Sequence, residues 1–319
     1  MKNMLMLFCA LLGFATLATP QVANVTAKQR YPWNGLVDVA VTLSGTEEEC
    51  KTAMFLLCVT NKTTQTELPI RSVTPVGAAT GAGNTWIRRF VWDATADVGR
   101  AKFGEVVLTV GLSLGVQLWE NGPYWAECNV GATKPEESGY YFWWGDTVGY
   151  KRNANKNGWI SVKDSTAFSF STENCPTDGK DISQLQLAGY IDSTGNLVAQ
   201  YDAARAHLGV PWRLPTDAEI SALVSNCTTT WTTRNGVCGC LITGKGAYVS
   251  KNIFVPAAGY GYDSSLNSLG SYGCYWSSTP NSPYYNFAWG LFFGSGDFER
   301  CDGVRRHGRS VRPVRGFAQ

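Results

Sequence analysis

A regular alternation of apolar and polar residues over positions 36–43 constrains the fold of this 319-residue chain more than any other feature. The apolar residues of LVDVAVTL recur at every second position, so they share one face of a β-strand: Val37, Val39, Val41 and Leu43. Similar strand patterns follow at 55–59, 86–92 and 106–110, with turn residues between them at 81–84. Short strands at this spacing predict a small antiparallel β-sandwich over residues 19–113.

The composition changes after Gly111–Gly115. Beyond this segment, Trp, Tyr and Gly dominate, and the whole chain contains 12 Trp, 14 Tyr and 34 Gly. Aromatic residues with glycine-rich connections favour β-structure with long, shaped loops. Since 319 residues exceed one ordinary hydrophobic core, we expect a second domain over residues 116–319, with the seam at Gly111–Gly115.

The first 18 residues have the pattern of a secretory signal peptide. Lys2 precedes an apolar run from Met4 to Leu17, and Thr16 and Ala18 are small residues suited to a cleavage site after Ala18. The run is shorter than the ~20 residues that a transmembrane helix needs. We therefore expect a secreted, periplasmic or cell-surface protein with no membrane span. The formal net charge of +2 gives no reason to expect nucleic-acid binding.

Cysteine usage agrees with export. Removing Cys9 with the leader leaves nine of the ten cysteines, an odd number. An exported chain can keep disulfides, so we expect disulfides and at least one thiol that stays free or pairs between molecules. Cys238-Gly239-Cys240 is not a CxxC pair and the chain has two His, so we expect no zinc site.

Two helices stand out in the second domain. One covers about Asp202 to Leu208. The other begins at Thr216, where Thr216 and Glu219 form the reciprocal pattern of a capping box. An apolar stripe at helical spacing follows and is assigned to the core: Ile220, Leu223 and Val224.

An ordered set of motifs in residues 116–315 resembles one family. The segments that carry it are LW (118–119), WAECNVGAT (125–133), YFWWGD (141–146), WRLPT (212–216), FVPAAGY (254–260), YWSST (275–279), AW (288–289) and SVRPVR (310–315). Together they resemble the Fibrobacter-type major paralogous domain. That domain belongs to the C-type-lectin-like group, which includes formylglycine-generating enzymes and the variable proteins of diversity-generating retroelements. The resemblance implies an α+β fold: an N-terminal antiparallel β-sandwich followed by a C-type-lectin-like domain.

The motifs of known chemistry in this group are absent. Formylglycine-generating enzymes carry an RGGSW-like motif, and here the corresponding segment, 309–313, is RSVRP. The HExxH, GxSxG and P-loop patterns are missing, as are the EPN, QPD and WND motifs of calcium-dependent lectins. The acids Asp297, Glu299 and Asp302 could hold a hard cation, but we interpret them as solvated loop acids. We expect no catalytic residue, no metal and no cofactor. An oxidase relative and a structural surface protein remain the alternatives.

What remains is a binding surface near the C-terminus. In AWGLFFGS (288–295), the side chains of Trp289, Leu291 and Phe293 share one face, which we assign to the core, while Gly290, Phe292 and Gly294 share the other. In retroelement variable proteins the outward positions are rewritten, and the resemblance implies a variable region over 276–315. The ligand-binding positions would be Tyr284, Tyr285, Phe287, Gly290, Phe292, Gly294, Asp297, Glu299, Arg300, Cys301, Asp302, Val304, Arg305 and His307.

Tyr, Arg and Gly in this set are residue types of adaptable paratopes. The expected partner is a protein or glycan ligand on a cell or phage surface. Because Cys301 lies among the ligand-binding positions, we expect it to be the unpaired thiol. Among the C-terminal arginines, we expect Arg312 to pair internally, and Arg305 and Arg306 to be solvated.

Overall fold

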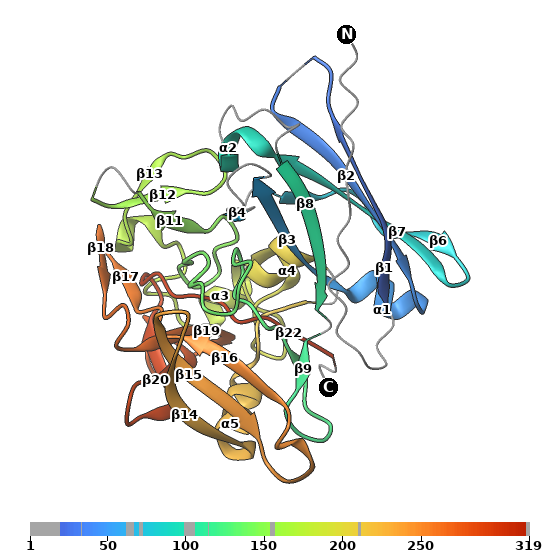
Figure 1. Cartoon of the computed structure of the whole chain (residues 1–319). Coiled ribbons are helices and arrows are strands. Elements are labelled where there is room, and N and C mark those ends of the chain that lie inside the picture. The colour runs from blue at the N-terminus through green and yellow to red at the C-terminus, as the bar shows by residue number, and fades with distance from the viewer. Residues whose placement is uncertain are drawn as a thin grey trace. The chain divides into compact units, whose positions relative to one another are not determined.

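The computed structural model describes residues 20–32, 34–61, 67–69, 73–98, 106–113, 115–153, 157–209 and 212–316. The signal peptide expected at 1–18 lies outside these residues. The structure is β-rich, with 44% strand, 15% helix and several antiparallel sheets (Figure 1). The chain divides into two compact units, Met1–Leu114 and Gly115–Gln319. The expected glycine seam is largely strand, because Gly111–Ser113 continue a ladder in which Gly111 pairs with Leu56.

Unit 1 contains two antiparallel sheets, in the orders β1-β2-β7-β5, with β6 also on β7, and β4-β3-β8. Its elements are β1 (Gln21–Gln29), β2 (Leu36–Ser44), α1 (Glu47–Thr52), β3 (Met54–Asn61), β4 (Glu67–Pro69), β5 (Val73–Pro75), β6 (Thr80–Ala82), β7 (Thr85–Asp93), α2 (Ala94–Val98) and β8 (Val106–Ser113).

The two sheets of unit 1 share one hydrophobic core. The alternation predicted for β2 is confirmed, since all four of its apolar positions are buried: Val37, Val39, Val41 and Leu43. From the second sheet, Val59 of β3 and Leu108 of β8 join the same core cluster. One face of each sheet is therefore removed from water, as the period-two pattern requires.

Unit 2 is built from short strands, small helices and much irregular chain. Its elements are β9 (Val116–Gln117), β10 (Tyr124–Trp125), β11 (Tyr150–Arg152), β12 (Trp159–Ser161), β13 (Ala167–Phe168), η2 (Thr172–Asn174), α3 (Ile182–Leu187), η3 (Ala199–Tyr201), α4 (Ala203–Leu208), α5 (Asp217–Asn226), β14 (Cys227–Arg234), β15 (Val237–Gly244), η4 (Gly246–Tyr248), β16 (Asn252–Pro256), β17 (Tyr260–Tyr262), β18 (Ser265–Asn267), β19 (Gly273–Pro280), β20 (Phe287–Phe293), β21 (Phe298–Val304) and β22 (Val314–Arg315).

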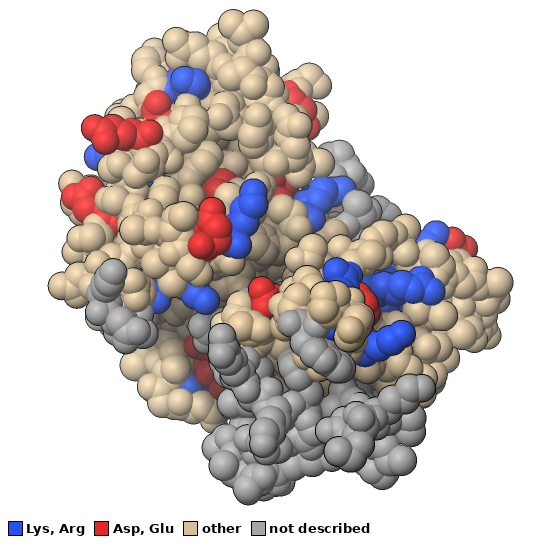
Figure 2. All heavy atoms as spheres, turned by 90° about the horizontal axis from the view of Figure 1, so that it is seen from above, with Lys and Arg blue, Asp and Glu red and all other residues tan. Residues whose placement is uncertain are grey.

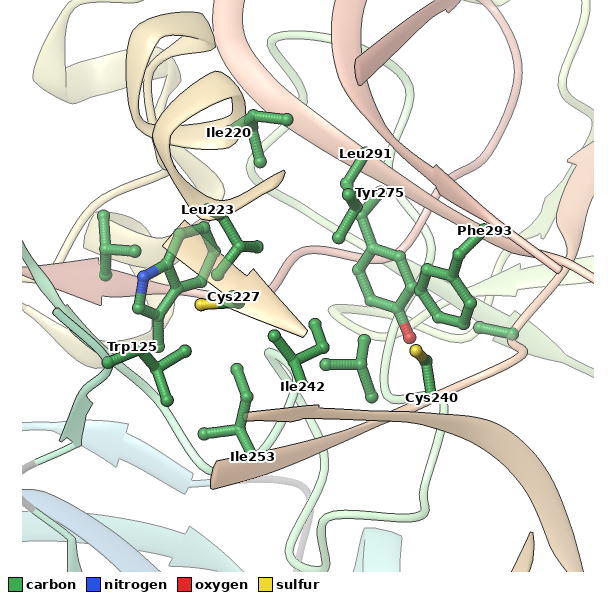
Figure 3. Close-up of a cluster of buried hydrophobic side chains, with 14 residues drawn as sticks. Trp125, Ile220, Leu223, Cys227, Cys240, Ile242, Ile253, Tyr275, Leu291 and Phe293 are labelled. Carbon is green, nitrogen blue, oxygen red and sulfur yellow. The ribbon is translucent and has the colours of Figure 1, made fainter. Parts of the chain in front are cut away.

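Helix α5 begins where the sequence predicted. Thr216 is its N-cap, and the capping box with Glu219 is present in both directions. Arg213 reinforces it through two bonds to the Glu219 carboxylate, of 2.7 and 2.6 Å. Ile220 and Leu223 are buried and project into a core that includes side chains of β15, β16, β19 and β20 (Figure 3). This helix thereby covers one face of the sheet formed by β19, β20 and β21.

The other expected helix is also confirmed. It runs over Ala203–Leu208, with Asp202 as its N-cap. The Asp202 carboxylate accepts bonds from the backbone N–H groups of Arg205 and Leu214, so it also fixes the segment that follows the helix. Sequence analysis missed α3, although Asp181 and Gln184 form a capping box at its start.

Arg312 pairs internally, as expected. Its side chain is 2% exposed and donates to Asn129 Oδ1 at 2.8 Å, to the Ala126 carbonyl at 3.0 Å and to the Phe254 carbonyl at 3.1 Å. Arg312 therefore joins its own C-terminal segment to residues 126–129 and to Phe254, which lie far from it in the sequence.

The disulfides expected from the sequence are not formed among the cysteines that the structure describes. These cysteines are free thiols: Cys50, Cys128, Cys175, Cys227, Cys238, Cys240, Cys274 and Cys301. Topology explains part of this result. Cys274 and Cys301 lie on the outer strands of one sheet with β20 between them, and a disulfide needs Cα atoms within about 7 Å.

Among the described helices, none is long and apolar enough to span a bilayer.

Candidate functional site

The predicted ligand-binding positions surround one antiparallel sheet of order β19-β20-β21. Residues directly opposite one another on such strands share a face. The register pairs Trp289 with Asp302 and Leu291 with Arg300, and on the other face it pairs Gly290 with Cys301 and Phe292 with Glu299. The predicted set therefore divides between two faces instead of forming one outward surface.

The face toward α5 is confirmed as core only in part. Leu291 and Phe293 are buried against Tyr275 of β19, as Figure 3 shows. Trp289 is half-buried, so its assignment to the core is wrong. Its ring is covered by the guanidinium of Arg300, which also donates to the Asp217 carboxylate at 2.8 Å.

Several predicted outward residues lie on this same face, beside the core residues of β20. Asp302 is half-buried and accepts a bond from the Asn281 side-chain amide at 2.6 Å. Phe287 and Val304, paired across the strands, are also half-buried. Phe287 and Phe292 are an odd number of residues apart on β20, so Phe287 and its partner Val304 lie on the face of the sheet opposite to Phe292.

The opposite face carries Phe292, which stacks on Tyr272 with ring centroids 5.1 Å apart. Phe292 is half-buried and Tyr272 is 41% exposed. Gly290 and Gly294, predicted as variable surface positions, are buried. A Cβ at Gly290 would overlap the Tyr275 carbonyl, and one at Gly294 would lie 2.9 Å from the Tyr272 ring. Gly290 is therefore needed for close packing and cannot be replaced by a residue that presents a side chain to a ligand. A side chain at Gly294 requires only that the partly exposed Tyr272 ring shifts.

His307 lies between two tyrosines of β17. Its ring stacks on Tyr260 at 5.2 Å and meets Tyr262 edge-on at 5.3 Å. Burial, followed by the charges of Arg309 and Arg306, lowers the pKa of His307 to about 4, so the ring is neutral at pH 7. It contributes to this surface as an aromatic ring and not as a cation.

Backbone pairing connects the two aromatic groups. Gly259, just before β17, bridges Gly273 and donates its N–H to the Tyr272 carbonyl at 2.7 Å, and Gly261 bridges Gly308. These bridges join the segments that carry the two groups. We call these five residues together the aromatic face: Tyr260, Tyr262, Tyr272, Phe292 and His307.

Sequence analysis missed the three tyrosines of the aromatic face. The Tyr260-Gly261-Tyr262 pattern was a signal, because two aromatic residues flanking a glycine on a strand share one face. Only Tyr260 belongs to the motif FVPAAGY that carries the family resemblance, and the pattern was not assigned to a surface. Tyr262 and Tyr272 are 42% and 41% exposed.

Two further predicted residues border this face. Glu299, opposite Phe292, is exposed, and Cys301, opposite Gly290, is half-buried. Burial raises the pKa of the Cys301 thiol, and the nearby charge of Arg309 opposes that shift. The thiol is therefore protonated at neutral pH.

Arg305 is not solvated. Its side chain is 0% exposed and donates to the carbonyls of Phe287, Thr177 and Lys180 at 2.9, 3.0 and 2.7 Å. Burial lowers its pKa to about 10, so it remains charged. Arg306 is also not fully solvated, since it pairs with the buried Asp178 at 3.1 Å. A planar guanidinium satisfies several carbonyls at once, which makes Arg305 a structural clamp.

The loop before β20 supplies the most exposed members of the predicted set. Tyr284 and Tyr285 are 61% and 57% exposed, and Tyr284 contacts the ring of Phe287 edge-on at 5.8 Å. Asp297, in the turn between β20 and β21, is exposed too.

On the face of the molecule that Figure 2 shows, charged side chains of both signs are spread among a majority of uncharged residues. Within the described residues, no group of three or more His, Cys, Asp or Glu side chains is placed to hold a metal ion.

Comparison with known proteins gives one finding. Residues 243–314 match the model of a domain of unknown function, DUF8237. The matched segment contains the β17–β18 hairpin and the β19-β20-β21 sheet, and hence all residues of the aromatic face. No curated protein and no solved structure matches the chain.

Proposed function

We propose that this chain is an exported ligand-binding protein that presents the aromatic face to a protein or glycan on a cell or phage surface. One observation carries the proposal. Two groups of partly exposed aromatic rings, His307 with Tyr260 and Tyr262, and Phe292 with Tyr272, lie on segments of unit 2 that backbone bridges join. Half-exposed aromatic side chains combine large contact area with a polar edge and are typical of binding surfaces.

The scaffold is part of the same proposal. The two sheets of unit 1 suit a β-sandwich, and the short strands, small helices and long ordered loops of unit 2 suit a C-type-lectin-like domain. In that arrangement the C-terminal strands carry the variable positions of retroelement-diversified receptors and adhesins. The exposed residues Tyr284, Tyr285, Asp297 and Glu299 are suited to such variation, because their side chains contribute little to packing.

The test is binding of the purified chain to an array of glycans and extracellular proteins. We expect a selective ligand, and we expect a triple variant, Tyr262→Ala, Tyr272→Ala and Phe292→Ala, to lose at least tenfold in affinity while remaining folded. The matched control replaces two other exposed apolar residues, Leu187→Ala and Val249→Ala, which are 91% and 66% exposed. Equal loss in the control, or unchanged binding by the triple variant, would contradict the proposal.

The alternatives make different predictions. A structural surface protein would keep its partner contacts after replacement of the aromatic face. An oxidase relative would convert a substrate, and the conversion would cease when one residue is replaced. Export has its own test: intact-mass measurement of secreted protein should give a chain that starts near Thr19, and retention of Met1 would refute it.

A further inference from the structure

Arg309 is a buried guanidinium with few partners. Its side chain is 7% exposed and donates one hydrogen bond to the described residues, from Nη2 to the Asp302 carbonyl at 3.3 Å. Nε and Nη1 are shielded from solvent and have no acceptor in the part of the chain that the structure describes. Among the described residues, no carboxylate forms an ion pair with it, in contrast to the pairs formed by Arg300 and Arg306.

The groups around this guanidinium are neutral. Its carbon lies 4.5 Å from the centroid of the Trp276 ring. Glycines make room for it: a Cβ at Gly303 would overlap the guanidinium, and one at Gly290 would lie 3.5 Å from Nη1. Cys274 and Cys301 are both close enough for its charge to oppose the rise that burial causes in their pKa values.

Two acids on the neighbouring strand β21 form no described ion pair with Arg309. The Asp302 carboxylate accepts a hydrogen bond from the Asn281 side chain, and Glu299 is exposed to water. Burying a cation without a counter-ion is unfavourable, and a guanidinium with unused N–H groups matches the oxygen pair of a carboxylate. A site of this kind becomes stable when an anion enters it.

We propose that Arg309 binds the carboxylate of an acidic ligand that lies on the aromatic face. The inference rests on the proposed function, because the same surface would receive the rest of the ligand. His307 lies two residues away, with Gly308, which bridges Gly261 of β17, between them, and the charge of Arg309 contributes to the lowered pKa of His307. A carboxylate reaches Nε and Nη1 of Arg309 when the guanidinium, or a side chain that shields it from solvent, changes its rotamer. Such rotamer changes are common on binding.

The experiment measures thermal unfolding of the full chain at pH 7 in sodium acetate and in sodium chloride of equal ionic strength. We expect acetate to raise the Tm of unit 2 saturably, by about 3 °C at tenfold excess over its Kd. Arg309→Met should abolish the saturable part of the difference between the salts. This variant also controls for the general stabilisation that excluded salts produce. Sodium glucuronate, compared with glucose, then shows whether a sugar acid binds better than acetate.

A second variant keeps the test decisive if Arg309→Met fails to fold. Cys301→Asp places a carboxylate beside the guanidinium, so it should raise the Tm in chloride above that of Cys301→Ser and remove the acetate effect. A lower Tm with the acetate effect intact, or no acetate effect in the unmodified chain, would overturn the inference. Because acetate is tested without any partner, this failure differs from failure of the aromatic face to bind a ligand.

Discussion

The guanidinium of Arg300 lies over the indole ring of Trp289, with 3.3 Å between its carbon atom and the ring centroid. Its nitrogens also pair with Asp217 at the start of α5. A tryptophan at a position that alternation assigns to the core is thus half-buried beneath a partly exposed cation.

This difference in cover predicts different stabilities for two tryptophan variants. Trp276 is 1% exposed and donates its indole N–H to the Phe142 carbonyl at 2.8 Å. Trp276→Ala should therefore lower the free energy of unfolding of unit 2 by about 3–5 kcal/mol. Trp289→Ala should cost about 1–2 kcal/mol, because less ring area is buried. Urea unfolding measures both, and equal losses would show that Trp289 belongs to the core.

Replacement of two arginines in the C-terminal region should also lower the free energy of unfolding by different amounts, because one is buried and the other is partly exposed. Arg305→Met removes three hydrogen bonds to carbonyls in a site without solvent, and should cost about 3–5 kcal/mol. Arg300→Met removes a partly exposed pair and one contact with a ring, and should cost about 1 kcal/mol or less. Chemical denaturation of the two variants checks the ranking, and a stable Arg305→Met protein would refute the role of this residue as a clamp.

His207 and Asp146 should have opposite effects on the free energy of unfolding as the pH falls from 6.5 to 4. They lie in neighbouring segments, since His207 contacts the carbonyl of Thr147. Burial lowers the pKa of His207 to about 4, so acidification favours the unfolded chain, which binds the proton more readily. Burial raises the pKa of Asp146 to about 6, against bonds from the Val148 and Gly149 amides, so acidification favours the folded state. Each effect is on the order of 3 kcal/mol over this range.

The pH profiles of two variants separate these effects. His307 also has a pKa lowered to about 4, so the unmodified chain should lose stability as the pH falls. His207→Gln should flatten that loss, and Asp146→Asn should steepen it. Denaturant midpoints between pH 4 and 6.5 give the slopes, and identical slopes for the two variants would contradict the assignment.

Local patterns predicted the elements that depend on local interactions. The β2 alternation and the Thr216–Glu219 capping box were both correct, because neighbouring residues determine a strand face and a helix start. The sequence could not predict how much of each face of the β19-β20-β21 sheet is buried by other parts of the chain. That depends on α5 and on segments distant in the chain, so Trp289 was assigned to the core and Gly290 to the surface.

Arginine burial was equally hard to predict. Arg is usually exposed, and the sequence offers no sign that three carbonyls from two distant segments converge on Arg305. The aromatic face was missed for a related reason. Tyr260 and His307 are 47 positions apart, and the bridge between Gly261 and Gly308 brings them together.

The predicted variable positions should therefore differ in their tolerance to substitution. Tyr284, Tyr285 and Glu299 are exposed, and replacement of each should cost less than about 1 kcal/mol. Gly290→Ser should prevent normal folding, because any Cβ there overlaps the Tyr275 carbonyl across the strand pair. Saturation mutagenesis with a readout of folded, protease-resistant protein would measure every position at once. If Gly290 accepts side chains as freely as Glu299 does, the sheet is looser than described, and the variable surface extends over both faces.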